Sequence, residues 1–455
     1  MAEKLLSVGL DVGTTSTQMI VSELRIENRA SSFAVPDMEI TERNIRYKSP
    51  VHFTPLLDES HVDGQKLRQL VDEEYAAAGI TRADVDTGAV IITGETSRKE
   101  NARAVLSALT DLAGDFVVAT AGPDLESVLA ARGAGAVAYS EQTGKTVLHV
   151  DIGGGTSNLA FIESGKIVAT GCLNVGGRLV KFDENRRIHY VSPVLGELCK
   201  LKPGDMATEQ DLEPVAQLLT QALEMAAGLR QPNALLEKLT TREIMEHRFP
   251  RGKAEVLSFS GGVADCIGQE IPWQKFGDMG PILGRAIRNS LLCRDVYRLG
   301  EETIRATVIG AGCHSAQLSG STVFYRNVRF PMKSLPAVAL GEQEQLNAQT
   351  IRSLLARQEG DTVVLALPGI RAPHHAQIAA MAEVIAEGFG TRPVVVALEQ
   401  DMAKALGHAL ALRLPGERQI LCIDNVRLSG DSYLDVGAPV GPALPIVVKT
   451  LILNR

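Results

Sequence analysis

The amino-acid sequence predicts an α/β protein of more than one domain. Apolar runs of strand length alternate with stretches of helical periodicity along most of the chain. Two of the apolar runs lead into glycine-rich turns opened by an aspartate, Asp-Val-Gly-Thr-Thr at residues 11–15 and Asp-Ile-Gly-Gly-Gly-Thr at residues 151–156. The length of 455 residues and the hydrophobic fraction of 45% allow about two to four domains with cores of their own.

The first glycine turn is predicted to lie inside a β-hairpin. An apolar run at residues 5–10 precedes the turn, and a second run at residues 19–21 follows it. Residues 25–65 are mixed in character and contain three prolines, so they predict an irregular insertion or short strands. The pattern that follows predicts a helix, a strand, a second helix and a second strand, at residues 64–78, 88–93, 97–112 and 116–120.

The second glycine turn is predicted to lie in a similar hairpin. An alanine- and glycine-rich segment at residues 124–139 predicts a helix packed closely on a neighbour. Strands are predicted at residues 146–152, 156–163 and 166–172, followed by a polar, mainly helical region that extends to about residue 248. A strand at residues 254–260 then runs into Gly261 and Gly262, and a further Ala/Gly helix is predicted at residues 304–320.

The chain changes character after Phe330. A helix is predicted at residues 348–357, and strands that alternate with alanine-rich helices are predicted at residues 362–368, 393–398 and 419–424. This pattern predicts a separate, small α/β domain at the C-terminal end. The last strand is followed by polar residues that are consistent with either a ligand site or a surface loop, namely Asp424, Asn425 and Asp431.

The composition excludes several classes of partner. The formal net charge of −8 disfavours a phosphate-backbone partner, and an aromatic fraction of 4% leaves few rings for base stacking. No stretch reaches about 18 uninterrupted apolar residues, and the N-terminus lacks a basic segment followed by an apolar core. We therefore expect a cytoplasmic protein with no nucleic-acid partner and no membrane segment.

The cysteines and histidines lack metal-binding spacing. The six cysteines include no Cys-x-x-Cys pair, and the nine histidines include no His-Glu-x-x-His pattern. We expect reduced, mostly buried thiols, and histidines that are packing or surface residues.

The two aspartate–glycine turns predict phosphate and magnesium binding. A glycine turn after a strand can direct several backbone N–H groups at an anion, because glycine has no side chain and tolerates positive φ. Two such turns facing each other would hold the phosphates of one nucleotide, with Asp11 and Asp151 placed to meet Mg²⁺. Either turn alone is equally consistent with an ordinary tight turn.

Five features of the chain occur in a characteristic order. They are the first glycine turn, an Ala/Gly helix, the second glycine turn, a strand ending in Phe-Ser-Gly-Gly at residues 259–262, and a second Ala/Gly helix. In this order the chain resembles the ATPase superfamily of actin, sugar kinases and heat-shock chaperones over residues 1 to about 325. The resemblance implies a two-lobed actin-like fold of duplicated ribonuclease H-like domains. We expect lobes at residues 1–143 and 144–328 and a C-terminal α/β domain at residues 329–455.

The same resemblance implies a role for each residue of the two turns. Gly13, Thr14 and Thr15 would cradle the β- and γ-phosphates, while Asp11 and Asp151 would hold Mg²⁺ through water. Asp151 would also orient the attacking water. The residues that would cover the phosphates from the other lobe are Gly153, Gly154, Gly155 and Thr156. The residues that would lie against the ribose and α-phosphate are Gly261 and Gly262. The two Ala/Gly helices would cross as a hinge.

One departure from the superfamily predicts slow hydrolysis. The chaperone ATPases carry a carboxylate just before a proline at the start of the first hinge helix, whereas this chain has Gly122 before Pro123. Carboxylates that could substitute are Asp124, Glu126 and Glu95. Glu95 follows a predicted strand and joins Asp151 as a catalytic candidate, although a helix-capping role before the next helix is equally consistent with its position.

Four stretches spread over the whole chain carry a closer resemblance, at residues 7–18, 90–98, 147–158 and 429–437. In them the chain is similar to the reactivating factors of ethanolamine ammonia-lyase, an adenosylcobalamin enzyme. The resemblance implies a slow, Mg²⁺-dependent ATPase that acts as a chaperone in ethanolamine degradation. With ATP and Mg²⁺ as cofactors, it would bind the inactivated lyase and promote exchange of damaged cobalamin for intact adenosylcobalamin. Self-association and a location at the ethanolamine bacterial microcompartment stay open.

Other members of the superfamily fit the sequence less well. Polyphosphatases carry a Gly-Glu motif closer to their glycine turn, and dehydratase activators need a clustered pair of cysteine ligands. Sugar kinases need a catalytic base and a sugar pocket that this sequence does not reveal. Two alternatives stay open: an actin-like structural or recruiting ATP-binding protein, and a small-molecule kinase.

Overall fold

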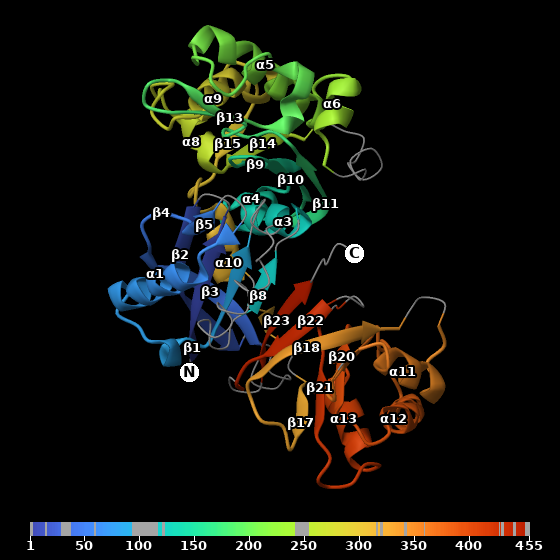
Figure 1. Cartoon of the computed structure of the whole chain (residues 1–455). Coiled ribbons are helices and arrows are strands. Elements are labelled where there is room, and N and C mark those ends of the chain that lie inside the picture. The colour runs from blue at the N-terminus through green and yellow to red at the C-terminus, as the bar shows by residue number, and fades with distance from the viewer. Residues whose placement is uncertain are drawn as a thin grey trace. The chain divides into compact units, whose positions relative to one another are not determined.

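The computed structural model contains two compact units (Figure 1). It describes residues 3–13, 16–28, 38–58, 61–92, 117–120, 123–241, 254–314, 317–318, 322–340, 344–358, 360–426, 428, 432–439 and 443–450. The first unit combines the described residues up to 120 with those from 317 onward, and the second unit holds those between 123 and 314. In this part of the chain, no helix is both long and apolar enough to cross a membrane.

The first unit begins with a mixed sheet. Its main strands are β1 (Glu3–Val12), β2 (Ser16–Asn28), β3 (Met38–Lys48), β7 (Thr87–Ile92) and β8 (Val117–Thr120). The order is β3-β2-β1-β7-β8, antiparallel from β3 to β1 and parallel from β1 to β8. Side chains alternate along β1, so Val8, Leu10 and Val12 pack with helix α1 (Gly64–Ala77) and Asp11 lies on the opposite face.

The prediction of an irregular insertion or short strands at residues 25–65 was wrong for residues 38–48, which form the long strand β3. Strand β3 pairs with most of β2 but is the edge of the sheet, and its side chains are largely exposed. A strand in that position needs few apolar residues, so hydrophobic periodicity does not reveal it. The short elements near it are β4 (His52–Phe53), β5 (Leu56–Asp58), β6 (His61–Val62) and the 3₁₀ helix η1 (Arg82–Asp84).

The second unit repeats the connectivity of the first sheet. Its strands are β9 (Val147–Ile152), β10 (Ser157–Glu163), β11 (Lys166–Leu173), β14 (Val256–Ser260) and β15 (Tyr297–Leu299). They follow the order β11-β10-β9-β14-β15, antiparallel from β11 to β9 and parallel from β9 to β15. Strand β9 thus takes the place of β1, and β14 the place of β7. This repeat confirms the predicted pair of ribonuclease H-like domains in an actin-like fold.

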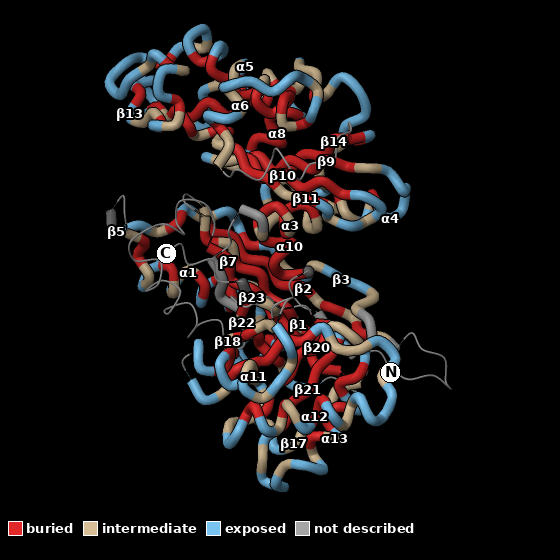
Figure 2. Tube along the Cα trace, turned by 90° about the vertical axis from the view of Figure 1, so that its right-hand side faces the viewer, coloured by how far each residue is buried: buried red, intermediate tan, exposed pale blue. Residues whose placement is uncertain are grey.

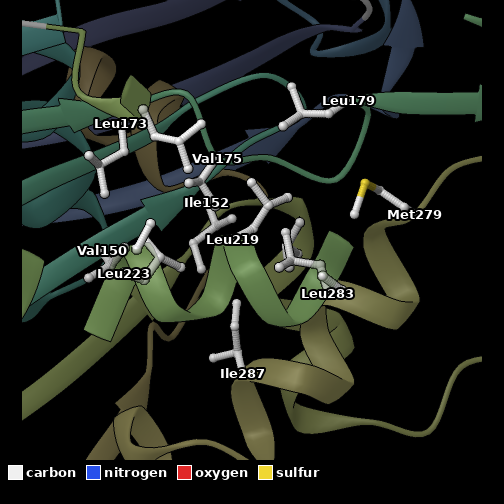
Figure 3. Close-up of a cluster of buried hydrophobic side chains, with 14 of the residues drawn as sticks. Val150, Ile152, Leu173, Val175, Leu179, Leu219, Leu223, Met279, Leu283 and Ile287 are labelled. Carbon is white, nitrogen blue, oxygen red and sulfur yellow. The ribbon is translucent and has the colours of Figure 1, made fainter. Parts of the chain in front are cut away.

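One face of the second sheet is covered by helices α5 (Glu209–Ala226) and α9 (Gly280–Arg288). Figure 3 shows Val150 and Ile152 of β9 pointing toward Leu219 of α5 and Leu283 of α9, and Figure 2 shows that these strands are buried. The strand that ends in the second glycine turn is therefore anchored in the largest apolar core of the unit.

The predicted helical region before residue 248 is only partly helical. It begins with two short strands that are below the length at which periodicity is informative, β12 (Val180–Phe182) and β13 (Ile188–Val191). The remaining short elements of the second unit are η3 (Pro193–Leu198), α6 (Ala234–Leu239), α8 (Gly262–Gly268) and η4 (Leu291–Cys293).

The two predicted Ala/Gly helices, α3 (Pro123–Gly133) and α10 (Ala306–His314), cross at very close range. A Cβ atom on Gly133 would lie 1.8 Å from the carbonyl oxygen of Ala306. A Cβ atom on Gly310 would lie 2.1 Å from the carbonyl oxygen of Leu129. Glycine is therefore required on both helices by the close approach of the two backbones.

Helix α3 is followed by a separate helix, α4 (Ala136–Thr143), where the sequence predicts one continuous helix. Gly135 separates them with a φ of +75°, a conformation that interrupts helical geometry. Alanines of α3 and α4 pack on the second sheet, on the face opposite α5, although the predicted division places these helices in the first lobe.

The C-terminal part of the first unit is an α/β domain around an eight-stranded sheet in the order β16-β23-β22-β18-β19-β20-β21-β17. Its strands are β16 (Gln317–Leu318), β17 (Phe324–Arg326), β18 (Met332–Ala339), β19 (Val364–Leu367), β20 (Val394–Leu398), β21 (Ile420–Ile423), β22 (Ser432–Val436) and β23 (Pro445–Thr450). Its helices are α11 (Ala348–Leu355), α12 (His375–Phe389) and α13 (Ala403–Ala411). Strands β18 to β21 are parallel, as the predicted alternation requires, and β23 contacts β8 of the first sheet.

Candidate functional site

The second glycine turn is a short loop with a fixed backbone. The N–H of Gly153 donates to the carbonyl of Thr156 at 2.9 Å, which closes the loop. The carbonyls of Gly153 and Gly154 accept hydrogen bonds from the N–H groups of Gly177 at 3.0 Å and Arg178 at 2.7 Å. In a trans peptide the N–H points away from the carbonyl. The N–H groups of Gly154 and Gly155 are therefore directed away from residues 177–178, as an anion-binding turn requires.

The segment that supports this turn was not assigned a role from the sequence. A Cβ atom on Gly176 would lie 2.3 Å from the carbonyl oxygen of Gly154, so only glycine allows this approach. The Arg178 side chain lies against Gly154 and forms an ion pair with Asp278 (Nε to Oδ2, 3.4 Å). The only sequence signal was the Gly-Gly pair before Arg178, and its role became clear from its contact with the glycine turn.

Asp151 is the penultimate residue of β9, just before the turn, and its side chain is buried. Its Oδ1 atom accepts a hydrogen bond from the hydroxyl of Ser260 on β14, and Thr307 of α10 bonds the same carboxyl group. Burial raises the pKa of Asp151 to about 6, and the two hydrogen bonds oppose that rise. At neutral pH the group is a buried carboxylate beside a turn of backbone donors.

His149 lies two residues earlier on the same face of β9 and is fully buried. Its Nδ1 is 3.1 Å from the Ser258 hydroxyl, and its Nε2 is 2.9 Å from the Ser260 hydroxyl. Burial lowers the pKa of His149 to about 3, so the ring is neutral. The sequence predicted a packing or surface residue and missed the hydrogen bonds, because both serines come from a strand about 110 residues away.

Glu126 is the substitute carboxylate whose position the structure describes. Helix α3 places it, buried, at 2.7 Å from Asn158 (Oε2 to Nδ2), and Asn158 is the cross-strand partner of Asp151. Directly opposed residues of antiparallel strands share a face of the sheet. Glu126 is therefore bound to the nearest cross-strand neighbour of Asp151.

Gly261 and Gly262 follow β14, as predicted. Gly261 has a φ of +85°, and a Cβ atom on it would lie 2.3 Å from the carbonyl oxygen of Ile152. Its N–H donates to the carbonyl of Thr303 at 2.9 Å. The structure thus gives Gly261 an intramolecular reason to be glycine, whereas a Cβ on Gly262 would meet its nearest atom, Cδ1 of Ile304, only at 4.0 Å.

The first glycine turn is supported by a hydroxyl group. The N–H of Gly13 donates to the carbonyl of Ser16 at 2.9 Å, and Thr54 Oγ1 donates to the carbonyl of Gly13 at 2.7 Å. The Thr54 hydroxyl is also 3.1 Å from that of Thr17. Asp11, half-buried at the end of β1, precedes the turn. Thr54 lies in the region that the sequence predicted as irregular, so its contact was missed.

Several predicted residues lie outside the described part of the chain, namely Thr14, Thr15, Glu95, the predicted helix at residues 97–112, Gly122 and Asp431. Of the polar residues after β21, Asp424 is buried and accepts a hydrogen bond from Thr322, so it is not a surface residue.

The residues of each turn suit a magnesium ion that is held mainly by phosphate and water. Among the described residues no group of three or more His, Cys, Asp or Glu side chains forms a metal site. Each turn instead follows one aspartate, and the second turn also directs the N–H groups of Gly154 and Gly155 away from residues 177–178. Mg²⁺ is commonly bound by one or two carboxylates plus substrate phosphates. The six cysteines are thiols that form no disulfide, and they are mostly buried, as predicted.

Comparison with known proteins gives a match along the whole chain. The family model described as "Ethanolamine utilisation protein EutA" matches residues 3–454. The chain is 38% identical to the ethanolamine ammonia-lyase reactivase EutA of Salmonella typhimurium, with 98% of each chain covered. It is also 38% identical to the protein of that name from Escherichia coli, again over 98% of both.

Similar solved structures are much more distant. A PPX-GPPA enzyme of Aquifex aeolicus is 14% identical with a TM-score of 0.43, over 68% of this chain and 99% of that one. The ethanolamine utilisation protein EutJ of Carboxydothermus hydrogenoformans is 17% identical with a TM-score of 0.33, over 68% and 89% of the two chains.

Proposed function

Because the chain belongs to the EutA family of ethanolamine utilisation proteins, we propose that it is an ATP-dependent reactivating factor of ethanolamine ammonia-lyase. The observation that carries the proposal is the 38% identity, over 98% of both chains, to relatives named reactivases of that lyase. In this function the chain binds the inactivated lyase and promotes exchange of damaged cobalamin for intact adenosylcobalamin.

The two aspartate–glycine turns are the proposed ATP site. The N–H groups of Gly154 and Gly155 would bind phosphate oxygens, with Thr156 beside them, and the first turn would contribute Gly13, Thr14 and Thr15. Magnesium would neutralise phosphate charge when bound, held through water by the carboxylates of the two turns, Asp11 and Asp151. Gly261 and Gly262 would lie near the ribose, where Gly262 leaves room for a ligand.

ATP would act chiefly as a conformational ligand. A nucleotide that binds one arrangement of two lobes more tightly than another shifts the equilibrium between them, and hydrolysis resets it. The absence of a carboxylate before Pro123 supports slow turnover. Asp151 would orient the attacking water, assisted by Glu95 or by Glu126, whose bond to Asn158 places it beside the cross-strand partner of Asp151.

The proposal includes a cellular setting. The chain would act in the cytoplasm, at or near the ethanolamine microcompartment, because its partner would be the lyase and not a membrane or a nucleic acid. Self-association would be compatible with this function.

Reactivation of blocked lyase tests the proposal. Lyase inactivated with cyanocobalamin is mixed with this chain, adenosylcobalamin and Mg-ATP, and ethanolamine deamination is measured. We expect activity to return only when the chain and ATP are both present. Recovery that is equal without the chain would contradict reactivation, and recovery that is equal without ATP would contradict ATP dependence.

A further inference from the structure

A series of three buried hydrogen bonds ends on the carboxylate of Asp151. Ser258 contacts Nδ1 of His149, Nε2 of His149 contacts Ser260, and Ser260 donates to Oδ1 of Asp151. All four side chains are at least nine-tenths buried. They come from two adjacent parallel strands, in which Ser258 is paired with His149 and Ser260 with Asp151.

Counting hydrogen atoms determines which group donates and which accepts in each of these hydrogen bonds. Ser260 has one hydroxyl hydrogen, which it donates to Asp151, so its oxygen must accept from Nε2–H of His149. The neutral ring then has no hydrogen on Nδ1, which accepts from the hydroxyl of Ser258. Each hydrogen bond in this series is therefore donated in the direction of Asp151.

The duplicated fold supplies an internal comparison. In the first sheet, β1 and β7 occupy the places of β9 and β14, and their equivalent pairs are Gly9 with Ala89 and Asp11 with Ile91. None of Gly9, Ala89 and Ile91 has a side chain that can form a hydrogen bond. The repeated strands therefore do not require polar residues at these positions, and the fold alone does not explain His149 and its two serines.

We propose that Ser258, His149 and Ser260 are positioning residues that orient the Asp151 carboxylate toward the magnesium-bound nucleotide. The proposal rests on the nucleotide-binding function proposed above. Ser260 holds Oδ1 from the neighbouring strand, and this contact, together with the hydrogen bond from Thr307, restricts rotation of the carboxylate at the glycine turn. A carboxylate held in this way loses little rotational freedom when it binds an ion. Mutation of such hydrogen-bonding partners typically lowers metal affinity or activity by about 10- to 100-fold.

Two replacements of His149 separate positioning from packing. The amide nitrogen of glutamine can take the place of Nε2 and donate to Ser260, whereas asparagine is shorter and reaches only Ser258. Magnesium is titrated into the full-length chain with a fluorescent ATP analogue, and thermal unfolding is recorded for each variant. We expect His149→Asn and Ser260→Ala to raise the Mg²⁺ concentration for half-maximal binding about tenfold, and His149→Gln to stay within about threefold of the wild type.

Thr220→Val is the matched control. It removes a buried hydroxyl that donates to a backbone carbonyl of α5 in the same unit, at 2.8 Å, and it should leave the magnesium dependence unchanged. If Ser260→Ala, folded by its thermal transition, binds at the wild-type Mg²⁺ concentration, the positioning role is overturned. Equal losses in the glutamine and asparagine variants would also overturn it. A wild-type chain that binds no nucleotide would instead contradict the proposed ATP site on which the inference rests.

Discussion

The two glycine turns share a backbone plan but differ in what lies behind the aspartate. Each turn joins two antiparallel strands, and each aspartate is paired across the hairpin with an amide side chain, Gln18 for Asp11 and Asn158 for Asp151. The strand on the other side is apolar at Ile91 in the first sheet and polar at Ser260 in the second. Duplication thus repeats the strands and the turn, while the chemistry at each aspartate depends on a few neighbouring side chains.

The largest expected effect is a difference between the two aspartates. Asp151→Asn should lower ATP hydrolysis by roughly 10²- to 10³-fold, because it removes a preorganised carboxylate at the proposed reaction centre. Asp11→Asn should lower it less, by about tenfold, because Asp11 would act on magnesium alone. Steady-state hydrolysis at saturating Mg-ATP measures both.

The asparagine variants keep size and remove charge, and a cooperative unfolding transition in each variant serves as the control for correct folding. Equal losses at the two positions would contradict a special role for the buried aspartate. A larger loss at Asp11 would reverse the assignment of water orientation.

Two glycines of the second unit should respond in opposite ways to alanine. Gly176→Ala should destabilise the second unit by about 1–3 kcal/mol, because its Cβ would collide with the Gly154 carbonyl. Gly155→Ala should leave stability nearly unchanged, since no protein atom lies within 4 Å of the added Cβ, yet it should weaken nucleotide binding. Urea unfolding and nucleotide titration distinguish the two effects.

Gly155→Ala is the more informative of the pair. If it binds nucleotide as well as the wild type, the backbone of the turn does not approach the phosphates closely. That result would favour the ordinary tight turn that the sequence alone left open.

Most of the actin-like part was predictable because its signals are local. Strands that end in glycine, and helices rich in alanine and glycine, are recognisable within windows of about ten residues. The edge strand β3 and the short strands β12 and β13 were missed because exposure or shortness removes that signal.

The supporting residues of the site were not predictable for a different reason. Ser260 and Ser258 meet His149 only through the pairing of β9 with β14, and Thr54 reaches Gly13 across 41 residues. Such contacts depend on strand register, which the pattern of one segment does not determine. The aspartates themselves were predictable, because each lies beside its glycines in the sequence.

The pH dependence of stability should reveal the two buried titratable groups of β9 that lie behind the second turn. His149 has its pKa lowered from 6.5 to about 3, so its contribution is complete above pH 6.5 and is lost as the pH falls toward 3. Asp151 has its pKa raised from 3.8 to about 6, so it acts in the opposite sense, and stability falls as the pH rises from 3.8 through 6. The two effects partly offset each other between pH 6 and 5.

Asp151→Asn should expose the histidine effect. The variant should lose about 2 kcal/mol of unfolding free energy between pH 6.5 and 5, and the wild type about 1 kcal/mol less. Fluorescence of Trp273, the only tryptophan of the chain, follows the second unit, because its ring packs on Phe182 with ring centroids 5.3 Å apart. Adding His149→Gln should abolish the loss. A double variant that keeps the full acid sensitivity would exclude His149 as its source.

The smallest expected effect concerns the hydroxyl that supports the first turn. Thr54→Val keeps the shape of the side chain but removes the hydrogen bond to the Gly13 carbonyl, which contributes about 1 kcal/mol to holding the first turn in place. We expect nucleotide binding to weaken by about two- to fivefold, since that difference in free energy corresponds to such a ratio. Thr41→Val is the control, because it removes a hydroxyl contact to the Arg25 carbonyl in the same unit at 3.4 Å. If both variants bind equally well, Thr54 does not orient the first turn. If only Thr54→Val weakens binding, the first turn depends on a hydroxyl group from a loop beside the hairpin, whereas the second turn is held by the backbone N–H groups of Gly177 and Arg178.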